Sequence, residues 1–154
     1  MERRACRILV RTELDNSQLI PTMKKLTTFI HEHPNAKSAK PVDDADIKIQ
    51  ESKLGLYFGS QYMAFLKEYG CLVVGPNEIY GICGNNNAIP SSIHATLSAR
   101  KENSIPESLV VIAEDGRGKF ICIDSKDAVF SVEHGTTSSL NQSFEDFAIG
   151  WLAS

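Results

Sequence analysis

Two apolar runs separated by a short glycine-rich stretch constrain the fold of this chain more than any other feature. The runs are Leu109–Ala113 and Lys119–Ile123, and the five residues between them include two glycines. Apolar runs of this length on either side of a glycine turn are typical of a β-hairpin. We therefore predict an antiparallel hairpin here. Asp124 follows the second run and is expected to cap the next turn, before Ala128.

Five segments carry the apolar spacing, the capping residues or the stop signals of helices. Apolar residues three or four positions apart predict an amphipathic helix, and a serine or aspartate at its start can accept hydrogen bonds from the first turn. Ser143, followed three positions later by Asp146, is a variant of the capping box. The predicted helices are Leu19–Glu32, Asp43 or Asp44 to Leu54, Ser60–Tyr69, one that starts at Ser91 or Ser92 and carries Ile93 and Leu97, and one that starts at Ser143.

Three more segments have the composition of strands. Leu72–Val74 and Glu78–Cys83 flank a Gly-Pro-Asn turn, and Ala128–Val132 follows the hairpin. The polar stretches Asn35–Pro41 and Gly135–Leu140 are expected to be connections. Helices followed by a run of strands indicate an α+β fold. We expect N-terminal helices packed on a mostly antiparallel sheet of about five strands, with a C-terminal helix.

The length of 154 residues and the apolar content of 42% suit one domain with one core. We assign residues 19–154 to this domain, and residues 1–18, which show no clear period, to an N-terminal arm or an extra strand. No apolar run approaches the ~20 residues that span a bilayer. The N-terminus also lacks the apolar segment of a secretory signal. We therefore expect a cytoplasmic protein that does not bind a membrane.

Charge is divided unevenly along the chain. Residues 1–42 contain eight Lys/Arg and four Asp/Glu, whereas residues 43–154 contain eight Lys/Arg and fifteen Asp/Glu. The domain is therefore acidic, with a net charge of −7 beyond residue 42. An acidic surface disfavours nucleic-acid binding and favours a basic protein partner. Solubility alone is the alternative explanation.

Candidate metal and nucleotide sites lack the required spacing. His31 and His33 are two positions apart, so on a helix they point in different directions, whereas ligand pairs need a spacing of three or four. Gly116–Lys119 lies between two predicted strands and lacks the full phosphate-loop pattern. No cofactor, metal or nucleic acid is therefore expected.

The four cysteines are Cys6, Cys71, Cys83 and Cys122, and none forms a Cys-x-x-Cys pair. Buried free thiols are the main interpretation, because Cys83 and Cys122 stand in apolar contexts. A disulfide between Cys71 and Cys83 stays open as an alternative. A small hydrolase that pairs a cysteine with His94 or His134 also stays open, although no nucleophile motif is present.

Residues 54–70 read Leu-Gly-Leu-Tyr-Phe-Gly-Ser-Gln-Tyr-Met-Ala-Phe-Leu-Lys-Glu-Tyr-Gly. This block resembles the pattern Leu-Gly-x-x-Leu-Pro-x-x-Tyr-x-x-Phe-Leu-x-x-Tyr/Asn-Gly of the SUKH superfamily, the Smi/Knr-type domains. Residues 92–124 also match its layout of a helix, a proline, two apolar runs and an acid. The resemblance covers about residues 44–152. Phe58-Gly59 departs from the family's Leu-Pro, and a glycine there is expected to loosen the entry to the third helix.

The SUKH superfamily includes bacterial toxin-immunity proteins and yeast cell-wall-synthesis regulators, and as a class its members are not enzymes. The resemblance implies a mixed sheet and a protein-binding function: stoichiometric occlusion of a cognate toxin domain, with a basic nuclease as the expected partner. A regulatory or scaffold module that binds an endogenous protein is the alternative. The acids in the sheet turns and strand ends are the predicted contacts, because turns on a rigid sheet present side chains efficiently. They are Glu114, Asp115, Asp124, Asp127 and Glu133. A monomer or a weak dimer is expected.

Overall fold

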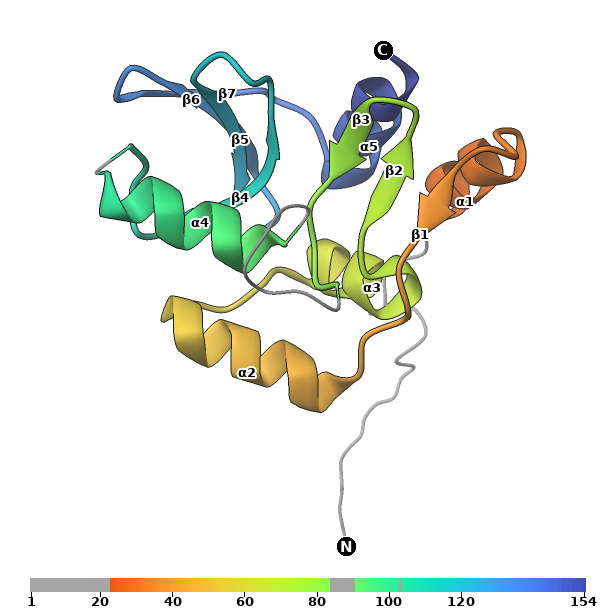
Figure 1. The fold of residues 1–154 in the computed structure, drawn as a ribbon, viewed down its shortest axis with the longest axis horizontal. Coiled ribbons are helices and arrows are strands. Elements are labelled where there is room, and N and C mark those ends of the chain that lie inside the picture. Colours follow the sequence, from red (N-terminus) through yellow and green to blue (C-terminus); the bar gives the residue numbers. More distant parts are fainter. Residues whose placement is uncertain (1–22, 84–90, 103) are drawn as a thin grey trace, which may run out of the picture.

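The computed structural model describes residues 23–83, 91–102 and 104–154. Five helices and seven strands lie in these ranges (Figure 1): α1 Lys24–His31, β1 Lys37–Ser38, α2 Asp44–Leu54, α3 Ser60–Tyr69, β2 Leu72–Val74, β3 Asn77–Ile79, α4 Ser92–Lys101, β4 Val110–Glu114, β5 Lys119–Ile123, β6 Val129–Glu133, β7 Thr136–Ser139 and α5 Phe144–Ala153. The predicted arm, residues 1–18, lies outside the described residues, as do residues 19–22 of the predicted first helix.

The strands form two antiparallel sheets. The first has the order β1-β2-β3 and the second has the order β4-β5-β6-β7. They meet where the backbone N–H of Tyr80 donates to the carbonyl of Ile112 over 2.7 Å. An isolated parallel bridge joins Gly81 and Ser91. The α+β class and the C-terminal helix are confirmed, but the strands are divided between two sheets rather than gathered in one of about five.

The predicted hairpin is present as β4 and β5. Their antiparallel register pairs Val110 with Ile123 and Glu114 with Phe120, with a bulge between Val111 and Ala113. The predicted cap is also confirmed, because one carboxylate oxygen of Asp124 accepts the N–H groups of both Lys126 and Ala128 at 2.9 Å. The second apolar run therefore ends in a turn that its own aspartate stabilises.

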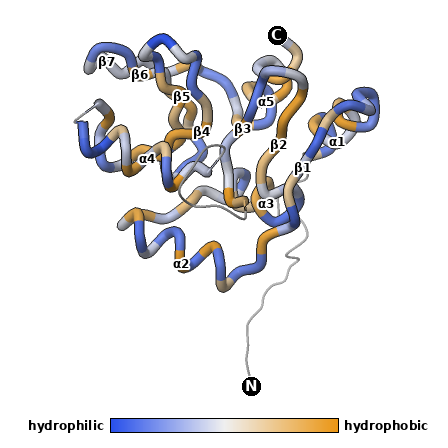
Figure 2. The backbone as a smooth tube through the Cα atoms, viewed as in Figure 1, coloured by the Kyte–Doolittle hydropathy of each residue, from blue (hydrophilic) through white to orange (hydrophobic). Residues whose placement is uncertain are grey.

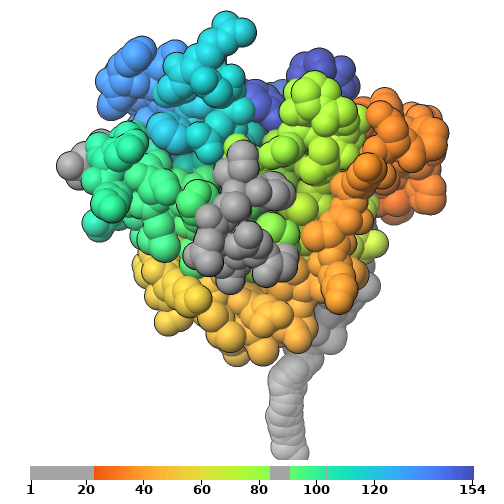
Figure 3. Space-filling view, in the orientation of Figure 1, coloured from red at the N-terminus to blue at the C-terminus, as the bar shows by residue number. Residues whose placement is uncertain are grey.

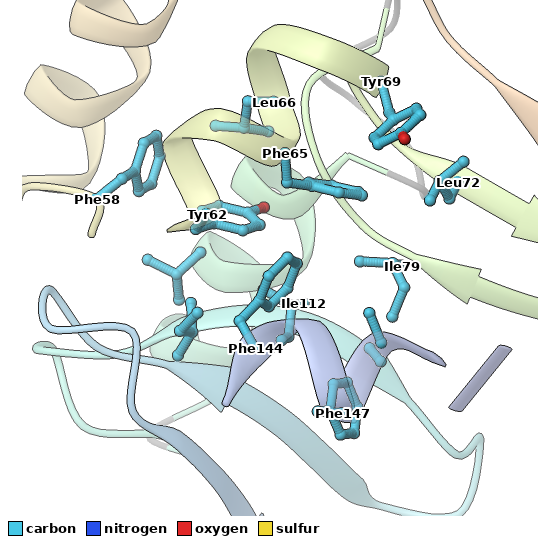
Figure 4. Close-up of a cluster of buried hydrophobic side chains, with 14 of the residues drawn as sticks. Phe58, Tyr62, Phe65, Leu66, Tyr69, Leu72, Ile79, Ile112, Phe144 and Phe147 are labelled. Atoms are coloured by element: carbon cyan, nitrogen blue, oxygen red, sulfur yellow. The ribbon is translucent and has the colours of Figure 1, made fainter. Parts of the chain in front are cut away.

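The main core lies between the helices α3 and α5 and the two sheets. Tyr62 and Phe65 of α3 pack against Phe144 of α5 with ring centroids 5.6 and 5.3 Å away, and their own centroids are 5.8 Å apart. Figure 4 shows these rings together with the aliphatic side chains of Ile79 and Ile112. Each fully buried side chain of this size contributes roughly 1.5–3 kcal/mol to the stability of the fold. The tyrosine hydroxyl is accommodated because it donates to the Tyr80 carbonyl at 2.8 Å.

The second sheet is covered on both faces. Ile112 and Ile121 belong to the main core, whereas Val111 and Cys122 face a smaller cluster with Ala95 and other residues of α4. Accordingly, Figure 2 shows hydrophobic residues along β2, β4 and β5, whereas β7 is pale. Strands that are buried on both faces read as continuous apolar runs. This is why β4 and β5 were the clearest strands in the sequence.

Several helix boundaries follow from the predicted caps. Asp43 accepts the N–H of Asp46 at 2.9 Å, and Ser143 accepts the N–H of Asp146 at 3.0 Å. Gly55, with a φ of 71°, ends α2 in the left-handed conformation that glycine adopts readily. Ser60 does not cap α3, because the cap position is Gly59. In α4, Leu97 was expected to face the core, but its side chain is 44% exposed.

Two strands lie in stretches that the sequence suggested were connections. β1 falls within Asn35–Pro41 and β7 falls within Gly135–Leu140. Every residue of both strands is exposed. A strand without a buried face carries no alternation of apolar and polar residues, so its pattern cannot be told from that of a loop.

Candidate functional site: an acidic groove where the two sheets meet

The second sheet places the predicted contact acids at opposite ends. Glu114 ends β4, Asp115 follows it, and Glu133 ends β6, directly across from the first residue of β5. Asp124 and Asp127 lie in the β5–β6 turn at the other end of the strands. Five strand residues span roughly 16 Å. The structure therefore brings three of the five acids to one end of the sheet and separates the other two from them.

A hollow of about 360 Å³ opens at the end that carries Glu114 and Asp115. It lies between the β2–β3 turn, the β4–β5 turn and helix α5, and its lining residues are Pro76, Asn77, Glu78, Tyr80, Glu114, Asp115, Gly116 and Trp151. Figure 3 shows it as a notch between the two projecting turns. Three carboxylates and two aromatic rings thus share one concave surface.

The aromatic rings of this hollow are held in place by the fold. The indole N–H of Trp151 donates to the Glu78 carbonyl at 3.1 Å, which ties α5 to β3. Burial raises the pKa of Tyr80, and the nearby carboxylates of Glu114 and Glu78 raise it further. The phenol therefore stays neutral at physiological pH, and the negative charge of the hollow resides on the carboxylates.

Two further hollows continue the surface across the end of the sheet. One of about 190 Å³ shares Glu114 with the first and lies between α4 and β5. The next, of about 320 Å³, shares Glu102 and Phe120 with the second and reaches the β6–β7 turn at His134. We call these three hollows together the acidic groove. Its carboxylates are Glu78, Glu102, Glu114 and Asp115, and its larger aromatic residues are Tyr80, Phe120 and Trp151.

The sequence did not predict Glu78, Glu102 or Trp151 as site residues. These three residues come from β3, the end of α4 and α5, which are far apart along the chain. No spacing rule connects them, and only the packing of the two sheets brings them together. The acids of the hairpin were predictable because a turn between two clear strands is visible in the sequence.

Asp115 has a structural as well as an electrostatic role. Its carboxylate accepts the N–H groups of Arg117 at 2.8 Å and Lys119 at 3.1 Å. These backbone hydrogen bonds lower the pKa of Asp115 below its ordinary value, and the positive charges of the same two residues add to the effect. The side chain remains exposed and ionised, so it contributes negative charge to the groove while holding the turn.

Asp127 caps a helix from another part of the chain. Its two carboxylate oxygens accept the N–H groups of Gln61 at 2.9 Å and Tyr62 at 3.0 Å, at the start of α3. The cap position itself is Gly59, and a Cβ at that residue would overlap the Asp127 carboxylate. The Phe58-Gly59 departure from the family pattern therefore does not loosen the helix entry. It makes room for a carboxylate that fixes this entry from the β5–β6 turn.

A larger hollow, of about 620 Å³, lies at the end of α2 and is lined by Lys48, Glu51, Ser52, Gly55, Leu56 and Tyr57. Its charge is balanced, with one lysine and one glutamate. The glutamate is already engaged, because Glu51 is buried and accepts the N–H of Phe58 at 2.7 Å. We therefore place the candidate site at the acidic groove, where the carboxylates lie on an open surface.

Cys71 and Cys122 are poorly suited to nucleophilic catalysis. Burial raises the pKa of the Cys71 thiol to about 11 and that of Cys122 to about 12. Each therefore stays protonated at neutral pH, whereas a nucleophilic cysteine needs a lowered pKa. No disulfide joins Cys71 to Cys83, so that alternative is not borne out. Cys6 lies outside the described residues.

Among the described residues, the structure does not bring His31 and His33 together with a third potential metal ligand. His33 stacks on Phe29 with ring centroids 4.0 Å apart, and its Nδ1 lies 2.7 Å from the carbonyl oxygen of that residue. His31 is exposed. Within residues 23–83, 91–102 and 104–154, no three His, Cys, Asp or Glu side chains are grouped to hold a metal ion. No helix in these ranges is long and apolar enough to cross a membrane.

Comparison with known families then places the chain. The model of the family described as SMI1-KNR4 cell-wall (SUKH_5) matches residues 17–152. The chain belongs to this family. Among solved structures, the SUKH_5 domain is similar to a crystal structure of a protein from Pseudomonas syringae pv. tomato, with a TM-score of 0.65 and 17% sequence identity. The match covers 83% of this chain and 99% of that one, and it supports the fold. A comparison with curated proteins found no significant match.

Proposed function

We propose that this SUKH_5 protein is an immunity protein that neutralises a toxin domain by binding it stoichiometrically, without catalysis, in the cytoplasm of the cell that makes both. The observation that carries the proposal is the acidic groove, which holds four carboxylates on a rigid and open surface. A nuclease toxin has a basic active site because it must bind phosphate. An acidic surface of matching shape can therefore occupy that site and exclude the nucleic acid.

The distribution of charge supports a basic partner. Residues 43–154 contain fifteen Asp/Glu and eight Lys/Arg. The summed field attracts a positively charged domain over distances comparable with the Debye length, about 8 Å at physiological salt. Trp151 and Tyr80 lie beside the carboxylates of the first hollow. An arginine of the partner that enters this hollow can form ion pairs and stack on an aromatic ring.

The proposal expects a toxin gene immediately upstream of this one, and the test is protection of cells from the toxin domain that it encodes. Cells that express both proteins should survive, and the variant Glu78→Lys/Glu102→Lys should lose protection. Glu68→Lys/Glu107→Lys is the matched control, because it reverses two exposed acids outside the groove and causes the same change in net charge. Equal protection by both double variants, with both proteins folded and equally expressed, would contradict the proposed site.

Binding of an endogenous protein is the second candidate function, and the description of the family, which refers to the cell wall, favours it. It requires no toxin gene in the neighbourhood. Failure of the wild-type protein to protect against the upstream toxin domain would contradict immunity. Capture of a protein of the host's own cell-wall synthesis machinery, lost in Glu78→Lys/Glu102→Lys, would then support the regulatory alternative.

A further inference from the structure

The outer edge of β7 is an open strand edge. The strand order places β7 at the end of the second sheet, with β6 as its hydrogen-bonding partner. All four of its residues, Thr136–Ser139, are exposed. Among the residues that the structure describes, no strand pairs with its other side. An open edge presents a row of unpaired N–H and C=O groups to any strand that approaches it.

This edge lacks the features that usually protect a strand from pairing. Natural edges are blocked by proline, lysine, inward-pointing charges or a bulge. The sequence from Gly135 to Ser143 contains no charged residue and no proline. The bulge of this sheet lies in β4, on the opposite edge. Within the part of the chain that the structure describes, nothing therefore blocks pairing at the β7 edge.

The hairpin geometry identifies which backbone groups face outward. His134 and Gly135 have φ values of 52° and 78°, as in the two-residue turn of a type I′ hairpin, so Glu133 and Thr136 form a hydrogen-bonded pair. Hydrogen-bonded and non-hydrogen-bonded pairs then alternate. The N–H of Leu140, which donates to Val129 at 2.9 Å, fits this alternation. Thr137 and Ser139 are thus the residues whose N–H and C=O groups face away from β6.

We propose that the β7 edge is a self-association surface, where a second copy of this chain pairs antiparallel with β7 about a twofold axis at Ser138. In this register Thr137 faces Ser139 of the second copy, so the outward groups of both residues are satisfied and the two four-stranded sheets become continuous. An antiparallel pairing of identical edges is closed, and it leaves no further edge for growth.

The β7 edge carries no charge, so it offers nothing complementary to a charged partner, whereas a second copy can pair there without bringing like charges together. Each copy is acidic, so most orientations of two copies bring like charges together. Glu133, the nearest acid, ends β6 across the hairpin from Thr136, so it lies on the side of β7 away from the second copy. The pairing thus occurs along an uncharged stretch. It also leaves the hollow beside Glu78 and Trp151 open, because that hollow lies next to β4, at the opposite edge of the sheet.

The proposed dimer is weak. A pairing confined to one four-residue strand buries far less than the ~1,200 Å² of a stable interface. Association is therefore concentration-dependent. It is independent of the proposed immunity function, since it concerns the protein without any partner.

The experiment is sedimentation equilibrium of the 154-residue protein over a series of concentrations. The wild-type mass should rise from 17.0 kDa towards twice that value as concentration increases. Ser138→Lys should lower the dimer association constant at least tenfold, because it places two like charges directly opposite each other. Thr136→Lys is the matched control. It carries the same charge on the same face of the strand but faces Leu140 of the other copy, so it should retain most of the association.

A mixture of two oppositely charged variants tests whether the twofold axis lies at Ser138. Ser138→Lys and Ser138→Glu should each be monomeric, whereas an equimolar mixture of the two should dimerise. A wild-type protein that keeps the monomer mass at all concentrations would overturn the proposal. A dimer that Ser138→Lys leaves intact would also overturn it, because the interface would then lie elsewhere.

Discussion

Asp127 shows how a single side chain can hold two distant parts of the fold together. It lies in the β5–β6 turn with a φ of 65°, yet its carboxylate accepts the first N–H groups of α3. The free N–H groups at a helix start need acceptors, and a negative charge there also suits the helix dipole. From the sequence, Asp127 was predicted only as a contact acid. No local pattern indicates a cap supplied by a residue more than sixty positions away.

Gly59 and Asp127 should be energetically coupled. Asp127→Ala should lower the free energy of unfolding by about 1 kcal/mol, the usual value of a helix cap. Gly59→Ala should also destabilise the protein, because the new Cβ overlaps the carboxylate. Chemical denaturation of both single variants and the double variant measures the coupling. Gly59→Ala should cost less in the Asp127→Ala background, and additive costs would show that the two residues do not share one space.

The buried thiols of Cys71 and Cys122 give a test of the hydrolase alternative. Because burial raises the pKa of Cys71 to about 11 and that of Cys122 to about 12, neither forms a significant thiolate at pH 8. We expect both to resist a maleimide reagent in the folded protein and to react quickly in denaturant, as peptide mass spectrometry would show. Rapid labelling of either residue in the folded state would revive the hydrolase alternative.

At the scale of elements, the sequence identified those with a buried face. The hairpin of β4 and β5, the cap of α5 at Ser143 and the end of α2 at Gly55 were all indicated by local rules. β1 and β7 were not, because exposed strands lack alternation. The division into two sheets was also not predictable, since it depends on how α3 and α5 fill the space between them.

The β4–β5 turn should depend on pH through Asp115. Its pKa in the folded state lies below the ordinary value of 3.8 because the N–H groups of Arg117 and Lys119 donate to its carboxylate. A lowered pKa means that the carboxylate stabilises the fold above about pH 3.8 and that this contribution disappears as the pH falls through the folded-state pKa. The stability difference between wild type and Asp115→Ala should therefore be largest near neutral pH and shrink in acid. A difference that is constant with pH would contradict this role.

At the scale of the whole molecule, the acidic groove follows from the meeting of the two sheets. The sequence predicted an acidic domain and two of the acids in the groove, Glu114 and Asp115. It did not predict the groove itself, because Glu78, Glu102 and Trp151 come from three separate elements. Net charge is a property of composition and is visible in a sequence. A concave surface is a property of packing and is not.

The most direct test of the central claim is the rate of association with the cognate toxin domain that the proposal expects, measured at low and high salt by stopped-flow fluorescence. Long-range attraction predicts that the wild-type rate falls steeply as salt rises. Glu78→Lys/Glu102→Lys should associate at least tenfold more slowly at low salt and lose most of the salt dependence. Glu68→Lys/Glu107→Lys should remain close to wild type. Rates that are independent of salt, or that fall equally in both double variants, would contradict recognition through the acidic groove.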